Sequence, residues 1–348
     1  MPGRPSHPQP PRFSVVICAW TEDRWDQLAA AIASVGGQSR PAWQTIVAVD
    51  HCPPLARRLA DAFPEATVVA SSGRPGLSGA RNTGLARATG EVVAFLDDDA
   101  VAAPDWLERL AAGYTSPEVA GVGGAVLPAW EAGRPGWFPP EFDWVIGCSY
   151  TGLPRGREPV RNLIGANMSF RREVFDLVGG FSEGLGRLGT RPLGCEETEL
   201  AIRIGQRRPG ACLLYDPSAV VHHLVPAQRA RWRYFRARCY AEGRSKAVVS
   251  RLVGAGDALA SERDYVRRVL PRAVAAGLAP GRPAGLRSAA TVLLGLGFTA
   301  GGYLHGRVAP AAGQGRSSAG ARPASAPSST RARSRSSSDR SRSSSSSR

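Results

Sequence analysis

Between residues 13 and 126, short apolar runs alternate with segments of helical periodicity, and this alternation restricts the chain to a few folds. The apolar, β-branched runs predict buried strands at 13–20, 44–50, 67–70, 91–96 and near 119–126. The intervening segments predict helices at 25–36, 55–63, 77–88 and 104–113. Strands that alternate with helices are typical of an α/β fold, in which a mostly parallel sheet is flanked by helices.

The pattern loosens after residue 127 and becomes rich in Gly, Pro and aromatic residues up to 195. Further along the chain we expect a helix at 196–206, strands at 211–215 and 219–223, and a basic helix at 228–250. Residues 288–304 carry no charge, and from about 308 the chain becomes a low-complexity Ser/Arg tail that cannot bury a core. The domains expected are an arm at 1–12, two halves of one domain at 13–126 and 127–227, a helical extension at 228–307 and a disordered tail at 308–348.

The formal charge of +15 does not indicate a nucleic-acid-binding protein. Much of the excess lies in the tail from residue 316, where arginines greatly outnumber acids and no aromatic residue is interleaved for base stacking. We expect a solubilising tail. The six cysteines form no CxxC pair, so neither a zinc site nor a disulfide framework is expected, and reduced cytosolic thiols are the default. The N-terminus lacks the charged-then-apolar pattern of a secretion signal.

Acidic residues stand where two predicted strands end, Asp50 after 44–50 and Asp97-Asp98-Asp99 after 91–96. Ligands of parallel sheets bind at the carboxyl ends of the strands. Three consecutive acids repel one another there unless a cation offsets them. Because Mg²⁺ and Mn²⁺ take carboxylate oxygens together with substrate phosphates, the triplet predicts a metal-diphosphate site. A solvated acidic turn is the alternative. Neither a P-loop nor a dinucleotide-binding GxGxxG follows the first strand.

Several blocks, taken in order, resemble family 2 glycosyltransferases of GT-A fold, over about residues 13–225. They are Phe13 to Ala19, Asp50, GLSGARNTGLARATGEVVAFLDDD (76–99), GANMSFRREVFDLVGGFSE (165–183) and CEETEL (195–200). The resemblance implies a Rossmann-like GT-A domain that uses a nucleotide-sugar donor, Mg²⁺ or Mn²⁺, and inversion at the anomeric carbon. The sequence departs from the family at Ala19-Trp20-Thr21-Glu22 and after Asp50, which leaves the nucleotide base undetermined.

The resemblance also implies roles for individual residues on the donor side. Asp99 is assigned to the metal, Asp97 to the ribose or sugar, and Asp50 to the nucleotide base. The remaining donor-side residues are Ala19, Arg81, Asn82 and Asp98. A plain salt bridge remains an alternative for Arg81, and a turn or helix cap for Asp50. His223 is expected to complete the metal shell, although a single histidine is more often structural.

On the acceptor side, Glu197 occupies the position of the family's catalytic Asp, one methylene longer. A transferred sugar needs a base within reach of the acceptor hydroxyl. Glu196 is the fallback, and both glutamates could instead simply complement a helix dipole. Asn167 and Glu183 are expected to shape the acceptor-sugar pocket, although the neighbouring Gly and Phe residues could simply pack.

The chain is therefore expected to transfer a sugar to a hydroxyl of a glycan or lipid-linked acceptor in cell-envelope or glycolipid synthesis. A sugar-nucleotide nucleotidyltransferase and a non-catalytic, membrane-attached binding protein are the alternatives. The uncharged segment 288–304 is about 25 Å long as a helix and is flanked by arginines, including Arg287 and Arg307. It predicts peripheral or monotopic attachment to the inner membrane face, with a cytoplasmic catalytic domain. A buried packing helix and a single span are the other interpretations of this segment.

Overall fold

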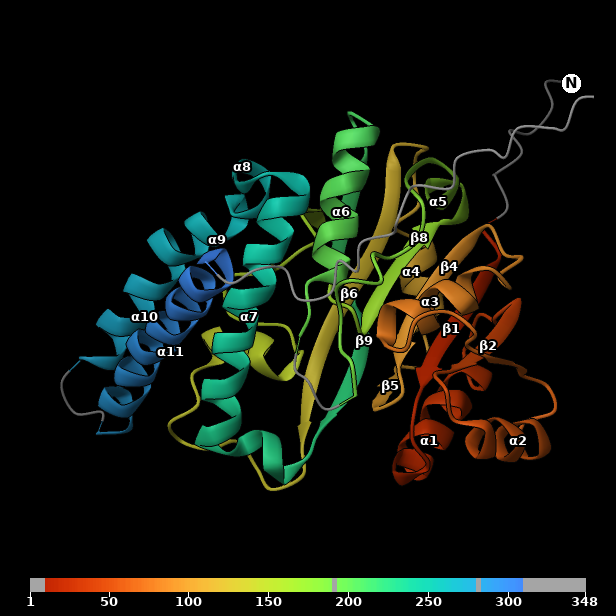
Figure 1. Cartoon of the computed structure of the whole chain (residues 1–348), viewed down its shortest axis with the longest axis horizontal. Helices are drawn as coiled ribbons and strands as arrows, with labels where there is room; N and C mark the ends of the chain where they lie inside the picture. Colours follow the sequence, from red (N-terminus) through yellow and green to blue (C-terminus); the bar gives the residue numbers. More distant parts are fainter. Residues whose placement is uncertain (1–9, 190–192, 280–282, 309–348) are drawn as a thin grey trace, which may run out of the picture. The chain divides into compact units, whose positions relative to one another are not determined.

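The structure is a computed structural model that describes residues 10–189, 193–279 and 283–308, all within one compact unit of the chain. The expected N-terminal arm lies outside the described residues up to residue 9, and the expected tail lies outside them from residue 309. The fold is α/β, with one nine-stranded sheet flanked by helices (Figure 1).

The first four strands form the parallel part of the sheet, in the order β3-β2-β1-β4. They are β1 (Phe13–Ala19), β2 (Gln44–Val49), β3 (Thr67–Ala70) and β4 (Val92–Asp97). The four strands predicted here are confirmed, with their ends within one residue. The apolar runs of β1, β2 and β4 are buried on both sides, as a parallel sheet covered by helices requires, whereas β3 at the sheet edge is partly exposed.

Helices cover both faces of the sheet. One face packs against α1 (Trp25–Gly36), α2 (Pro53–Ala62) and α4 (Trp106–Ala111). The other face packs against α3 (Leu77–Leu85), α5 (Arg172–Val178) and α6 (Glu196–Arg207). Helix α3 lies very close to β1, because a Cβ at Gly84 would stand 2.4 Å from a methyl group of Val16. This close approach brings α3 directly onto the middle of β1.

The second half of the sheet is mixed. It contains β5 (Ala100–Ala102), β6 (Val119–Trp130), β7 (Glu158–Val160), β8 (Asn167–Arg171) and β9 (Cys212–Val225). Strand β8 is antiparallel to both β4 and β6, whereas β6 and β9 are parallel. The two strands predicted at 211–215 and 219–223 are wrong as separate elements, because β9 continues through Asp216-Pro217. The carboxylate of Asp216 accepts bonds from the amide and hydroxyl of Ser218, and the β6–β9 register shifts there.

A helical extension follows the sheet, and its long helices lie side by side at the left of Figure 1. It comprises α7 (Trp232–Val253), α8 (Ala255–Ala258), α9 (Ala260–Asp264), the π-helical turn Tyr265–Val269, α10 (Leu270–Gly277) and α11 (Pro283–Val308). Helices α7 and α11 are in close contact: a Cβ at Gly302 would stand 2.0 Å from the Tyr240 carbonyl oxygen. Phe142, Phe235 and Val292 belong to the apolar core that joins the extension to the domain.

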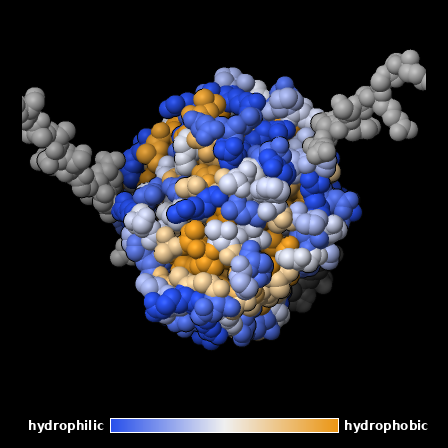
Figure 2. Space-filling model, turned by 90° about the vertical axis from the view of Figure 1, so that its right-hand side faces the viewer, coloured by the Kyte–Doolittle hydropathy of each residue, from blue (hydrophilic) through white to orange (hydrophobic). Residues whose placement is uncertain are grey.

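The apolar segment 288–304 lies within α11, and one side of that helix is exposed along its length. No helix among the described residues has an apolar stretch long enough to cross a membrane. The exposed large apolar residues of α11 are Leu286, Leu293, Leu294, Leu304 and Val308. Figure 2 looks instead on the side of the molecule that lies at the right of Figure 1, which is largely hydrophilic with separate apolar patches.

Candidate active site

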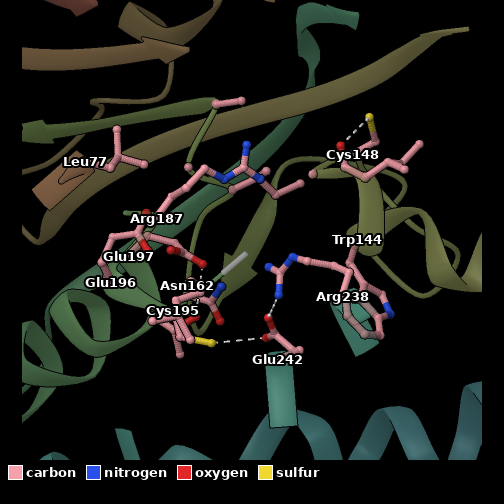
Figure 3. Close-up of a pocket in the computed structure, with 18 of the residues that line it drawn as sticks. Leu77, Trp144, Cys148, Asn162, Arg187, Cys195, Glu196, Glu197, Arg238 and Glu242 are labelled. Carbon is pink, nitrogen blue, oxygen red and sulfur yellow. Dashed lines mark hydrogen bonds and ion pairs between the residues drawn. The ribbon is translucent and has the colours of Figure 1, made fainter. Parts of the chain in front are cut away.

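A cavity of about 480 Å³ opens where the carboxyl ends of β1, β2 and β4 meet β9, α6 and the helical extension. Most of the residues singled out from the sequence line it: Ala19, Asp50, Arg81, Asp97, Asp98, Asp99, Glu196, Glu197 and His223. Figure 3 shows the part of this cavity in which the first turn of α6 faces α7.

The acidic triplet begins at Asp97, the last residue of β4, and continues into the turn that follows. Asp98 and Asp99 are buried, and Asp97 is partly exposed. The ligand atoms of Asp97, Asp99 and His223 all lie within 4.8 Å of one another. His223 faces inward because side chains alternate along β9, which leaves His222 exposed. Two carboxylates and an imidazole suit Mn²⁺ well, and the carboxylates also suit Mg²⁺, so these residues fit the divalent ion that the sequence predicts.

Two arginines that the sequence did not single out surround the triplet. Arg24 donates to Asp98 at 2.8 Å and lies 3.2 Å from Asp99, and Arg229 donates to Asp99 at 3.0 Å. Burial alone would raise the pKa of Asp99, but His223, Arg229 and Arg24 hold it well below its usual range. Burial and the neighbouring Asp99 raise the pKa of Asp98 to about 7. The chain is rich in arginine, and no local sequence pattern identifies these two as neighbours of the acidic triplet.

Arg81 connects α3, the end of β4 and the start of α6. It is only 2% exposed, and its Nη1 lies 2.6 Å from Glu196 Oε1 while its Nη2 lies 3.3 Å from Asp97 Oδ1. The second carboxylate oxygen of Glu196 is buried and has no hydrogen-bond partner among the described residues. One carboxylate oxygen of Glu196 is therefore paired with Arg81.

Glu197 lines the same cavity, but its carboxylate is not paired in the way that the Glu196 carboxylate is. Among the described residues it has no ion-pair partner within 4.0 Å, and its carboxylate accepts only a 3.3 Å bond from the Thr198 hydroxyl. Burial and the charge of Glu196 raise the pKa of Glu197 to about 8. A carboxylate with such a pKa is well suited to accept a proton near neutral pH.

Three predicted site residues, Asn82, Asn167 and Glu183, are not among the residues that line this cavity. The Asn82 amide bonds the backbone of Phe181 in both directions, at 2.9 and 2.7 Å. Asn167 is fully buried and donates to the carbonyls of Ala125 and Ala219. Glu183 is exposed beside a separate shallow hollow near Gly73. The side-chain amides of both asparagines therefore bond to backbone groups of neighbouring segments.

Asp50 stands at the cavity, and its carboxylate also orders the loop before α3. Oδ2 accepts a bond from the Gly76 amide at 2.8 Å, and Oδ1 lies 2.7 Å from His51 Nδ1. The first of these contacts ties the end of β2 to the glycine that precedes Arg81's helix. The turn interpretation and the donor-side interpretation of Asp50 are therefore compatible.

The cavity extends beyond the predicted residues, beneath the helical extension. Its walls there include Arg161, Arg238, Glu242, Lys246 and Glu262. Figure 3 shows Glu242 and Arg238 facing the start of α6 across the cavity, and Cys195 bonded to Glu242. Sequence reasoning missed this wall, because a basic helix on its own predicts only a solvated face.

Three comparisons with known proteins agree with this arrangement. The family model described as "Glycosyl transferase family 2" matches residues 14–179. A glucosyl-dolichyl phosphate glucuronosyltransferase of Haloferax volcanii is 34% identical over 245 residues, which cover 69% of this chain and 78% of the relative. The succinoglycan biosynthesis protein ExoM of Rhizobium meliloti is 26% identical over 239 residues, 67% of this chain and 73% of the relative.

Among solved structures, a similar fold occurs in a mannosyltransferase of Pyrobaculum calidifontis that was solved with GDP-Man and Mn²⁺. The two folds superpose with a TM-score of 0.52 at 19% sequence identity. The superposition covers 85% of this chain and 87% of the mannosyltransferase.

Proposed function

The chain belongs to glycosyl transferase family 2 and is a glycosyltransferase, and from this premise we propose that it moves a sugar from a nucleoside-diphosphate donor to a hydroxyl of a lipid-linked acceptor, with inversion. The observation that carries the proposal is that one cavity holds both kinds of group. The Asp97, Asp99 and His223 cluster lines it, and so does Glu197, which has no cation partner among the described residues.

On the donor side, Asp97, Asp99 and His223 would hold Mn²⁺ or Mg²⁺. A divalent ion there would offset the charge that grows on the leaving diphosphate. Arg81 and Arg24 add fixed positive charge at the same end, and Asp50 and Ala19 line the side from which the nucleoside would enter. The presence of a nucleotide sugar and Mn²⁺ in the mannosyltransferase of similar fold supports this choice of donor and ion.

On the acceptor side, Glu197 would take the proton of the attacking hydroxyl. Glu196 is less available to an acceptor hydroxyl, because one of its oxygens is already paired with Arg81 at 2.6 Å. Attack from the face opposite the leaving diphosphate then inverts the anomeric carbon. The longer arm of Glu197 relative to the family's Asp reaches into the cavity from the first turn of α6.

A lipid-linked acceptor is supported by a relative and by the surface of α11. The relative from Haloferax volcanii is named for a dolichyl phosphate-linked substrate. Helical geometry, at about 100° per residue, gathers Leu286, Leu293 and Leu304 on one exposed side of α11. Arg287 and Arg307 are exposed on the same helix, and Arg267, Arg268 and Arg272 precede it. We infer that this side rests on the anionic inner face of a membrane, with the catalytic domain in the cytoplasm.

The proposal is tested with the full chain and a panel of nucleotide sugars, with and without Mn²⁺. One donor should raise the melting temperature only when Mn²⁺ is present, because a ligand that binds the native state stabilises it. Free nucleoside diphosphate should then be released when acceptor is added. A nucleotidyltransferase would instead consume a nucleoside triphosphate and release pyrophosphate. Stabilisation by every donor without release of nucleoside diphosphate would favour a non-catalytic binding protein.

A further inference from the structure

The cavity wall beneath the helical extension contains a buried network of ion pairs that the mechanism above does not use. Lys246 on α7 lies 2.6 Å from Glu262 and 3.2 Å from Glu242. Arg238 lies 2.7 Å from Glu242, and Arg161 makes a two-pronged contact with Glu262 at 2.5 and 2.7 Å. All five side chains line the cavity. Burial alone would raise the pKa of Glu242 and Glu262, but the cations lower each to about 2.

The network has one more cation than it has carboxylates. Arg238 satisfies Glu242 and Arg161 satisfies Glu262, so Lys246 adds a positive charge beyond those two pairs. Its side chain is only 15% exposed, and a buried charge is costly unless an opposite charge compensates it. The β4 end of the cavity is different, because three carboxylates, Asp97, Asp98 and Asp99, crowd together there. The acidic end suits a metal ion, and the basic end suits an anion.

The network is joined directly to the turn that carries the proposed base. Cys195 has a left-handed backbone conformation (φ 71°) and immediately precedes Glu196 and Glu197 on α6. Its thiol donates to Glu242 Oε1 at 3.1 Å, a contact drawn in Figure 3. An anion held at Lys246 would therefore lie near Glu197, on the acceptor side of the cavity.

The wall beyond the network is apolar. Val266, Leu270, Leu296 and Ala300 line it, from the π-helical turn, α10 and α11. Helix α11 thus contributes the partly buried Leu296 to this wall and the exposed Ala300 to its rim, while Leu293 and Leu294 are exposed. An anionic group at Lys246 would have an apolar environment for an attached hydrocarbon chain, leading toward the proposed membrane face.

We propose that Lys246, together with Arg238 and Arg161, binds the phosphate of a prenyl phosphate-linked acceptor, and that Val266, Leu270 and Leu296 contact its first isoprenoid units. The inference rests on the proposed function, whose acceptor it locates. Lys246 is the chain's single lysine among 44 basic residues, and its compact ammonium group can turn from the glutamates to a phosphate without the fixed fork of an arginine.

The test measures binding, so it does not require the acceptor sugar to be known. The full chain is titrated with farnesyl phosphate below its aggregation concentration, and separately with farnesol and with inorganic phosphate. Farnesyl phosphate should bind saturably and more tightly than either part alone. Lys246→Met should weaken that binding about tenfold to a hundredfold, the loss of one charge-assisted hydrogen bond, and Lys246→Arg should recover part of it.

Lys246→Met is a suitable variant because each glutamate keeps an arginine partner, and its melting temperature without ligand checks that it folds. Arg244→Gln is the matched control, since Arg244 is exposed on the same helix, and it should bind like the original chain. Equal affinity of Lys246→Met and the original chain for farnesyl phosphate would overturn the subsite. Tight binding of inorganic phosphate alone would show an anion site that does not recognise a lipid. Tight binding of farnesol alone would show an apolar site that does not recognise phosphate. Either result would overturn the proposal. Donor binding with Mn²⁺, measured on the same samples, tests the proposed function separately.

Discussion

Arg81 lies 115 residues from Glu196 in the chain, and its guanidinium bonds the Glu196 carboxylate at 2.6 Å. This pairing distinguishes two adjacent acids that the sequence leaves nearly equivalent. Glu196 is paired with a buried arginine, whereas Glu197 faces the cavity without a cation among the described residues. The proposed assignment of the base depends on this difference.

Glu197→Gln should reduce kcat at least a hundredfold and leave the donor Kd close to its original value. The amide cannot accept the acceptor proton, but the donor end of the cavity is untouched. Turnover and donor binding are measured on the same protein. Glu196→Gln serves as the comparison and should mainly lower the melting temperature, because Arg81 loses a buried partner. A strong loss of kcat in Glu196→Gln with normal kcat in Glu197→Gln would reverse the assignment.

The pH profile of kcat/KM should rise with pH to a plateau, with its limb near the pKa of Glu197, about 8. The sign follows from the role: the base works only when deprotonated, and burial together with Glu196 favours its protonated form. Glu196→Gln removes that negative charge, so the limb of its residual activity should move to lower pH. A limb that stays at the same pH in Glu196→Gln would show that another group controls the profile.

Asp99→Asn should weaken Mn²⁺ binding at least tenfold and abolish most metal-dependent activity. Asp99 is in the cluster with Asp97 and His223, and an amide is a much weaker ligand than a carboxylate. Mn²⁺ affinity is measured by titration on the folded variant. Asp98→Asn is the matched control, because its carboxylate is not in that cluster and should affect metal affinity less. Unchanged Mn²⁺ affinity in Asp99→Asn would contradict the assignment.

Leu293→Glu combined with Leu294→Glu should reduce binding to anionic phospholipid vesicles at least tenfold. Both leucines are at least half exposed on α11, so the substitutions should leave the folded core intact. Sedimentation with vesicles at low salt is the measurement. Leu177→Glu, on α5 and 48% exposed, is the control and should bind as the original chain does. Equal sedimentation of all three proteins would remove α11 from the membrane contact.

The sequence determined the elements whose residues repeat with a regular period. Strands β1 to β4 are continuous apolar runs, and the helices between them show apolar residues at helical spacing. The acidic triplet could likewise be placed at the edge of the sheet, because a strand end can be read from neighbouring residues. Strand β8 escaped detection because three of its five residues are polar: Arg171, and also Asn167 and Ser169, which are both buried. Their side chains are satisfied by carbonyls of β6 and β9, which no local pattern reveals.

Which charged side chains pair with one another depends on the tertiary structure. Asp98 is paired with an arginine 74 residues away, and Asp99 with one 130 residues away. Asn82 and Asn167 belong to motifs that suggested substrate contact, yet folding directs their amides to the backbone. In the sequence, Lys246 belongs to a basic helix with no distinguishing pattern. In the fold, it lies in a buried ion-pair network with Glu242 and Glu262. Periodicity depends on neighbours in the chain, whereas an ion pair depends on the order of strands and the packing of helices, which bring distant residues within a few ångströms.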